Sequence, residues 1–490
     1  MKFYNRTDEL AYLNKIQGKA AQAAYFTILL GRRQVGKTAL IRHYLKSADI
    51  PALYFFVSKK NPSSLLEEFV EILSVQLPLL KQTRLESFDA FFSVLFDFLQ
   101  QTPAVVVFDE FQNFQQVDPA VFSILQKFWD TRKDNLKGHL LVIGSIISLM
   151  RKIFENEKEP LFNRPTGKLR IEPFDLETIK LILEDHQLAR STALLNYYAL
   201  FGGIPRYYFL LERAGLFGRE LDEIIRELIL EPNALLREEG RQLVIEAFGK
   251  ESAVYFSILS AIAGGHTQLS QIANQAGVAT TSASKYLDEL VSVYQIIERR
   301  DPVPSNGARK NGRYYLNDSF LAFWFRYVYR NLSTLEIANT SYLSQIIQKD
   351  WANYLGPMFE RLVQQRFVEL NRKNQFLFPA TQIGSYWDRG QTQIDLVAWS
   401  EHERQCLVGE CKLSSKRLDH NDCNLLRQRG ALLQQKTHCE NLHLGFFTAD
   451  EASEDLRGQL KEQGILLFTL PDLFDETNTP TIRGARSRRA

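Results

Sequence analysis

Residues 31–38 combine glycines, a lysine and a threonine at a spacing suited to phosphate chemistry. They are Gly31, Arg32, Arg33, Gln34, Val35, Gly36, Lys37 and Thr38, a complete G-x-x-x-x-G-K-T loop. Glycines let backbone N–H groups face phosphate oxygens, the lysine supplies positive charge, and the threonine hydroxyl is a ligand for Mg²⁺. An apolar run precedes the loop and a helical pattern follows it, as the motif requires. We therefore predict that these residues bind ATP and Mg²⁺.

A second apolar run, residues 103–108, leads directly into Asp109 and Glu110. Four apolar residues after Ala104 suit a central strand that is covered on both faces. Behind a phosphate-binding loop, Asp109 is expected to hold Mg²⁺ through water. Glu110 is expected to orient or deprotonate the attacking water, so the pair indicates hydrolysis rather than nucleotide storage.

Residues 1–170 alternate apolar runs with amphipathic segments, which predicts a parallel α/β sheet. The expected strands and helices are, in chain order, strands at 25–30, 52–57, 104–109 and 140–145 and helices near 62–77, 86–101 and 119–134. Ligands of such sheets lie beyond the carboxyl ends of the strands, where Lys37, Asp109 and Ser145 all fall. Ser145 is expected to reach a γ-phosphate or its water, with a plain strand-end hydroxyl as the alternative.

Residues 171–245 read as all-helical and contain the segment Phe201–Tyr208, a glycine turn followed by a basic and aromatic helix start. Arg206 is expected to reach a phosphate, and Pro205 with its aromatic neighbours to pack on adenine. A helix cap and core aromatic residues are the alternative interpretation.

Residues 251–316 predict three helices, the second and third joined at Gly277, followed by two short strands. This is a helix-turn-helix pattern with a wing. DNA contact would come from the third helix and the wing, and protein contact or autoinhibition is the alternative. The expected DNA contacts are Thr281, Ser282, Ser284 and Lys285, with Arg309, Lys310 and Arg313 on the DNA backbone.

Residues 350–475 predict a second α/β unit with acids in a nuclease-like order. Asp395, Glu410 and Lys412 follow the D…E-x-K pattern of many metal-dependent nucleases. Glu410 and Lys412 share one side of a strand, so two carboxylates would hold Mg²⁺ while the lysine positions the attacking water. Glu360, on the preceding helix, would also contact the metal. The alternative is a nuclease fold that persists as a binding module.

Composition limits the class of protein. The chain has 490 residues, 45% of them hydrophobic, and a net charge of +2, so nucleic-acid binding requires a local patch rather than bulk charge. No signal peptide and no membrane span are expected, and the four cysteines show no disulfide framework, so we expect a cytoplasmic protein. A zinc site among Cys406, Cys411, Cys423 and Cys439 lacks paired ligand spacing, and scattered core and surface residues are the better account.

These motifs, in this order, resemble a family of prokaryotic ATPases abundant in archaea. Its members join an AAA-type P-loop domain to a winged helix and a C-terminal restriction-endonuclease-like domain of unknown function. The matching segments are residues 3–10 (an Arg-x-x-Glu-Leu box), 31–38, 108–112, 161–167 and 202–207, and the Asp395, Glu410 and Lys412 core.

The resemblance implies five parts: a P-loop ATPase core (1–170), a helical lid (171–245), a winged helix-turn-helix (246–335), a nuclease-like domain (345–475) and a basic tail (476–490). It also implies a finger, Arg164 or Arg170, that acts across a subunit interface of a homo-oligomer. The expected function is a Mg²⁺-dependent ATPase whose nucleotide state controls a DNA-binding C-terminal region, with DNA cleavage by that region and binding alone as the two alternatives. An ATP-driven signalling or defence switch with protein partners, and a transcription regulator, are the alternatives.

Overall fold

The structure, a computed structural model, describes residues 2–188, 190–249, 252–305, 311–388 and 392–474. It divides into two compact units, of which the first comprises residues 1–174 and 204–209 and the second comprises 175–203 and 210–490. Each unit contains one five-stranded sheet. The predicted division into five parts is finer than this and stays a prediction.

The first unit is a parallel sheet with strand order β2-β3-β4-β1-β5. Its strands are β1 (Ala24–Gly31), β2 (Ala52–Phe56), β3 (Ala104–Asp109), β4 (Gly138–Gly144) and β5 (Gly167–Ile171). Every residue of β3 and β4 is buried, because helices cover both faces of the sheet. The prediction of a parallel α/β sheet is confirmed, and β5 is a strand that the sequence pattern did not reveal.

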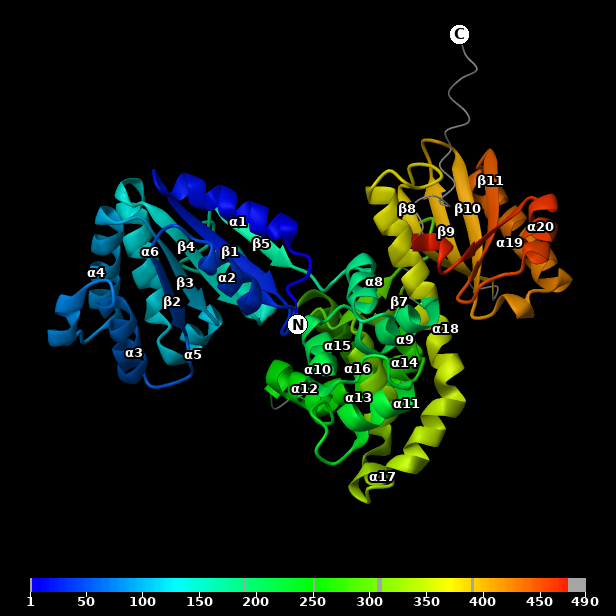
Figure 1. The fold of residues 1–490 in the computed structure, drawn as a ribbon, viewed down its shortest axis with the longest axis horizontal. Coiled ribbons are helices and arrows are strands. Elements are labelled where there is room, and N and C mark those ends of the chain that lie inside the picture. Colours follow the sequence, from blue (N-terminus) through cyan, green and yellow to red (C-terminus); the bar gives the residue numbers. More distant parts are fainter. Residues whose placement is uncertain (1, 189, 250–251, 306–310, 389–391, 475–490) are drawn as a thin grey trace, which may run out of the picture. The chain divides into compact units, whose positions relative to one another are not determined.

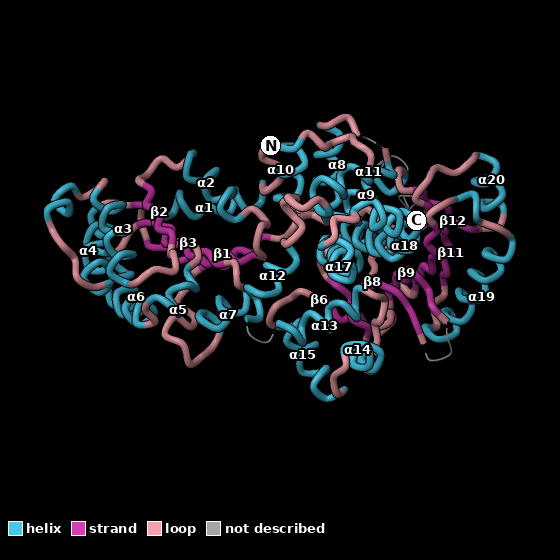
Figure 2. The backbone as a smooth tube through the Cα atoms, turned by 90° about the horizontal axis from the view of Figure 1, so that it is seen from below, coloured by secondary structure: helices cyan, strands magenta, loops and turns pink. Residues whose placement is uncertain are grey.

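Two layers of helices enclose this sheet (Figure 2). One layer contains α1 (Thr7–Ala20) and α2 (Lys37–Lys46). The other contains α3 (Pro62–Ser74), α4 (Phe88–Gln101), α5 (Phe114–Val117), α6 (Ala120–Arg132) and α7 (Ile147–Glu155). A cluster of phenylalanines fills the space under this second layer; Phe55 and Phe108 stack at its centre, with ring centroids 5.1 Å apart. This packing holds the strand ends that carry the polar residues.

The second unit begins with helices α8 (Leu176–Asp185) and α9 (Ser191–Phe201). Helix α10 (Pro205–Ala214) starts within the first unit, and α11 (Leu221–Ile225) and α12 (Glu239–Phe248) follow. Three helices and an antiparallel strand pair come next: α13 (Ser252–Ala263), α14 (Leu269–Ala276), α15 (Thr280–Ser292), β6 (Ile297–Arg300) and β7 (Arg313–Leu316). Gly277 ends α14 in the left-handed conformation at φ 68°, which makes the tight turn between α14 and α15.

A mixed sheet with strand order β12-β11-β10-β9-β8 ends the described chain. Helices α16 (Ser319–Phe323) and α17 (Leu332–Glu336) lead into α18 (Thr340–Arg372), a 33-residue helix. The sheet and its helices are β8 (Gln382–Trp387), β9 (Gln393–Ser400), β10 (Gln405–Lys412), α19 (His420–Thr437), β11 (Asn441–Thr448), α20 (Glu454–Glu462) and β12 (Ile465–Thr469). Figure 1 shows α18 running from the helical part of this unit to the sheet.

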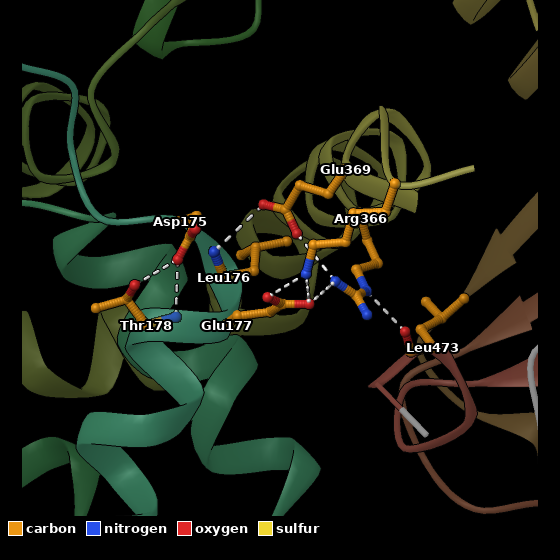
Figure 3. Close-up of polar contacts among 8 residues, drawn as sticks. Asp175, Leu176, Glu177, Thr178, Arg366, Glu369 and Leu473 are labelled. Carbon is orange, nitrogen blue, oxygen red and sulfur yellow. Dashed lines mark hydrogen bonds and ion pairs between the residues drawn. The ribbon is translucent and has the colours of Figure 1, made fainter. Parts of the chain in front are cut away.

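Arg366 on α18 ties together three distant segments of the second unit (Figure 3). It is only 3% exposed, and its guanidinium donates to Glu177 of α8 at 2.7 Å, to Glu369 at 3.2 Å and to the carbonyl oxygen of Leu473 at 2.7 Å. Two carboxylates and a carbonyl thus satisfy a buried cation, as such a charge requires.

Candidate functional site

The phosphate-binding loop lies between β1 and α2, at the carboxyl end of the first sheet. Gly36 and Gln34 adopt positive φ angles of 91° and 67°, which fold the loop back on itself. Gly31 lies so close to β5 that an added Cβ would stand 2.8 Å from the carbonyl oxygen of Ile171. The glycines of the motif are therefore needed for backbone shape and for close approach to the neighbouring strand.

Lys37 is 6% exposed, and its ammonium group donates to the carbonyl oxygens of Gly31 at 2.7 Å and Arg32 at 2.8 Å. Burial lowers the pKa of Lys37 to about 8, against the opposing charges of Glu110 and Asp109. The loop thus holds a buried cation on its own carbonyl oxygens, at the position where terminal phosphates are expected.

Asp109 lies within hydrogen-bonding reach of the loop. Its carboxylate accepts from the Thr38 hydroxyl at 3.1 Å, from the Tyr54 hydroxyl on β2 and from the backbone N–H of Glu110 at 2.9 Å. Hydroxyl and carboxylate oxygens are the donors that Mg²⁺ prefers, so this pair suits the metal chemically. The predicted Thr38 and Asp109 pair is together, whereas Tyr54 was not foreseen.

Glu110 follows β3 in the left-handed conformation, with φ 55° and ψ 39°. Its Oε2 atom accepts from Ser145 at 2.7 Å and from the side-chain nitrogen of Gln112. Ser145 therefore lies at the predicted strand end, but in this structure its hydroxyl contacts Glu110.

The segment that contains Pro205 and Arg206 belongs to the first unit. A Cβ added at Gly36 would lie 3.8 Å from the ring of Pro205, so the proline packs beside the phosphate-binding loop. The expected contacts of Pro205 with adenine and of Arg206 with a phosphate stay predictions.

Arg6 is a residue of this region that had no assigned role. It is 5% exposed and donates to the carbonyl oxygens of Val35 at 3.0 Å and Glu172 at 2.7 Å, and it pairs with Glu9 at 3.1 Å. It therefore connects the phosphate-binding loop to the segment after β5. Its membership of the Arg-x-x-Glu-Leu box was the only signal in the sequence.

The two proposed finger arginines have carboxylate partners within the first unit. Arg164 pairs with Asp130 of α6 at 3.1 Å, and its side chain is 30% exposed. Arg170 on β5 pairs with Glu172 and is 47% exposed. An action across a subunit interface would require both to exchange these partners for a phosphate.

The C-terminal sheet brings Asp395 of β9 and Glu410 of β10 close enough for the charge of one carboxylate to act on the other, and Asp395 also accepts from the backbone N–H of Cys411 at 3.0 Å. Burial, followed by the charge of Asp395, raises the pKa of Glu410 to about 7, and burial also raises the pKa of Asp395. Glu360 of α18 shares this environment, since burial and then the charge of Asp395 raise its pKa to about 8. The carboxyl groups thus lie close enough to repel one another when charged.

Among the described residues, no three His, Cys, Asp or Glu side chains form a group that could hold a metal ion. Asp395 and Glu410 offer two carboxylates of suitable chemistry, so water or substrate would complete the shell of a divalent ion. Glu360 with Asp395 and Glu410 would be such a group of three, so the structure does not support Glu360 as a further metal ligand. The cysteines Cys406, Cys411, Cys423 and Cys439 are free thiols.

The two cationic side chains beside this acidic pair each form an ion pair. Arg429 of α19 forms an ion pair with Glu410 at 2.5 Å, and Lys412 donates to Asp422 at 2.8 Å. The predicted Lys412 therefore sits on the same strand as Glu410 but turns to Asp422. Neither Arg429 nor Asp422 was foreseen, because their pairing depends on how α19 packs on β10.

The residues expected to contact DNA fall into three groups. Thr281, Ser282 and Lys285 are exposed on α15, and Ser284 is partly exposed. Arg313 of β7 is partly exposed; it donates to Gln393 at 3.1 Å and lies over the ring of Trp387 at 4.7 Å, so it contacts the C-terminal sheet. Arg309, Lys310 and the tail 476–490 lie outside the described residues.

Comparison with known proteins identifies the family. Residues 3–211 match an ATPase domain found predominantly in archaea, and residues 324–425 match a domain of archaeal and bacterial proteins of unknown function. The chain is 32% identical over 412 residues to the uncharacterized protein MJECL04 of Methanocaldococcus jannaschii, covering 84% of this chain and 87% of that protein. The chain belongs to this family of archaeal-type ATPases.

The fold of this chain is similar to that of a solved ATPase, and a second solved structure matches at a lower TM-score. The Walker-type ATPase Paby2304 of Pyrococcus abyssi is 19% identical, with a TM-score of 0.50 over 66% of this chain and 96% of that one. The ORC2 protein of Aeropyrum pernix, in its ADPNP and ADP complexes, is 14% identical, with a TM-score of 0.43 over 69% of this chain and 96% of that one. Family membership and the P-loop fold support ATP hydrolysis at the level of the family. No helix in the described part of this ATPase is long and apolar enough to cross a membrane.

Proposed function

We propose that this protein is a Mg²⁺-dependent ATP hydrolase whose nucleotide state controls a DNA-binding C-terminal region with a nuclease-like site. ATP hydrolysis is supported by the contact between Thr38 and Asp109, together with Glu110, which directly follows Asp109 in the chain. A metal ligand from the loop, an acid at the tip of the adjacent strand and a neighbouring base are the parts that P-loop hydrolysis uses.

In this proposal, Gly31–Thr38 bind the phosphates through backbone N–H groups, and Lys37 turns from its carbonyl partners to the terminal phosphates. Thr38 and Asp109 would hold Mg²⁺, which would neutralise the charge that develops during phosphoryl transfer. Glu110 then accepts a proton from the attacking water. Pro205 and Arg206 complete the nucleotide site from α10.

The DNA-binding part rests on α13–α15 with β6 and β7, which have the order of a winged helix-turn-helix. The exposed hydroxyls and Lys285 at the start of α15 support contact with DNA through this helix. Its wing strand β7 is linked to the C-terminal sheet by Arg313. DNA held by α15 would thus be presented by the same unit that carries Asp395 and Glu410.

A second candidate function is a signalling, defence or transcription switch in which the C-terminal region only binds its partner. The engagement of Glu410 by Arg429 and of Lys412 by Asp422 favours this alternative, because a cleaving site needs both groups free.

One experiment separates these functions. The purified protein is incubated with plasmid and oligonucleotide DNA, with Mg²⁺ or Mn²⁺, with and without ATP. Metal-dependent nicking that is lost in Asp395→Ala supports the nuclease, and DNA binding without nicking supports the transcription regulator. ATP hydrolysis with neither supports the signalling switch, and absence of ATP hydrolysis contradicts the proposal as a whole.

A further inference from the structure

We propose that Gln112 is a positioning residue that acts through Glu110. The inference rests on the role proposed above for Glu110 as the base of ATP hydrolysis. Gln112 lies two residues after Glu110, in a 3₁₀ turn (Phe111–Asn113), and it is only 1% exposed. A glutamine so deeply buried needs a polar partner, and its partner here is the proposed base.

Gln112, Glu110 and Ser145 form a closed triangle of side chains. The Gln112 amide nitrogen donates to Glu110 Oε2 and lies 3.4 Å from Ser145 Oγ, and Ser145 donates to the same Oε2 at 2.7 Å. Two donors thus converge on one oxygen of the carboxylate. The other oxygen, Oε1, is left to accept a proton from the attacking water.

The backbone conformation around Glu110, Gln112 and Ser145 keeps their side chains in contact. Glu110 adopts a left-handed conformation that costs a non-glycine residue free energy, which directs its side chain back toward β4. Gly144, at the end of β4, leaves the space that Gln112 fills, since an added Cβ would lie 2.8 Å from Gln112 Oε1 and 2.2 Å from Met150. Asn113 anchors the turn from the other side, donating to the carbonyl oxygen of Val57 at 2.8 Å.

The position of the Glu110 carboxylate matters because a general base must lie within hydrogen-bonding reach of the proton before its pKa can have any effect. Without Gln112, Ser145 alone would hold Oε2, and the Glu110 side chain would rotate among rotamers in which Oε1 faces away from the water. Hydrolysis would slow while nucleotide binding, which uses Lys37 and the loop backbone, would be unchanged.

The test is a double-mutant cycle of ATPase rates in the full-length protein. Gln112→Leu, which keeps the approximate volume but removes the donor, is expected to lower kcat about tenfold to a hundredfold with KM unchanged, because a positioned base contributes about 10²–10⁴-fold. In the Glu110→Gln background, Gln112→Leu is expected to have no further effect, since residues that act as a unit are non-additive. Gln116→Leu, at an exposed glutamine four residues on, is the matched control.

A second variant guards against misfolding. Gln112→Met, which also fills the space without a donor, should lower kcat to the same extent as Gln112→Leu, while both variants keep the wild-type affinity for ATP and the wild-type circular dichroism spectrum. An unchanged kcat in Gln112→Leu or Gln112→Met, or an equal loss in the wild-type and Glu110→Gln backgrounds, would overturn the inference. If Glu110→Gln itself hydrolyses ATP at the wild-type rate, the proposed role of Glu110 fails instead.

Discussion

The ammonium group of Lys37 lies 2.7 Å from the carbonyl oxygen of Gly31, at the opposite end of the same loop. The lysine is thus held by the loop that it is expected to leave when phosphates arrive. Its pKa, lowered by burial to about 8, makes the exchange sensitive to pH. Phosphates favour the charged form and raise this pKa in the complex.

We predict that the affinity for ATP falls as the pH rises above 8. A lysine that loses its proton in the free protein must regain it on binding, so the dissociation constant should rise about fivefold from pH 8 to 9 and approach a tenfold rise per pH unit above pH 9. Lys37→Ala should abolish measurable binding. The measurement is titration calorimetry across this pH range with Mg²⁺ present, and a constant affinity up to pH 9.5 would contradict the prediction.

Replacing Glu110 by glutamine should keep ATP binding and remove turnover. The amide fills the same space and still meets Ser145, but it cannot accept a proton, so hydrolysis should fall about 10²–10⁴-fold. Binding is measured with the non-hydrolysed variant and turnover by phosphate release. Equal rates in wild type and Glu110→Gln would refute the assigned role.

The motifs with a fixed spacing were predicted correctly as elements, because their chemistry depends on local sequence. The loop of residues 31–38 and the strand that ends at Asp109 are of this kind, and both lie at the carboxyl end of the sheet. Gln112 stands within the matched segment 108–112, yet only the packing of β4 beside β3 brings Ser145 to the Glu110 carboxylate that Gln112 contacts. Strand β5 lies at the sheet edge, where partly buried and exposed residues alternate and only Ile171 is buried, so its short pattern did not stand out in the sequence.

The C-terminal site, too, could be predicted from the sequence only in part. The order of Asp395, Glu410 and Lys412 predicted adjacent strands, and β9 pairs with β10. What could not be predicted is which cations face these acids. Arg429 comes from α19, a helix whose rotation on the sheet is set by many apolar contacts rather than by a motif.

A finger that acts across a subunit interface predicts complementation. Lys37→Ala removes nucleotide from a subunit, while Arg164→Ala with Arg170→Ala removes the fingers, so a mixture of the two proteins should recover part of the ATPase activity. The recovery should grow with protein concentration. A strict monomer with concentration-independent activity would exclude such a finger. The ion pair of Arg164 with Asp130 would then be structural.

Lys285 gives a test of DNA contact through α15. If its ammonium meets a phosphate, Lys285→Ala should weaken binding to all sequences and reduce the slope of log K against log salt by about one. Lys349→Ala, at an exposed lysine on α18, is the matched control. Binding measured by fluorescence anisotropy that is identical in the two variants would favour the protein-contact alternative.

The last prediction concerns Arg429, whose ion pair with Glu410 supplies positive charge where a divalent ion would bind. Arg429→Gln should strengthen Mn²⁺ binding by about three- to tenfold, because a partly buried ion pair of about 1 kcal/mol no longer competes with the metal. Arg427→Gln is the matched control, since Arg427 lies on the same helix and contacts Gln463 instead.

Asp395→Asn should weaken Mn²⁺ binding both with Arg429 present and with Arg429→Gln. Bound Mn²⁺ is measured by electron paramagnetic resonance with Lys37→Ala present to empty the ATP site. An affinity unchanged by Arg429→Gln and by Asp395→Asn would mean that the acidic pair holds no metal, which leaves the binding-module alternative for the C-terminal domain.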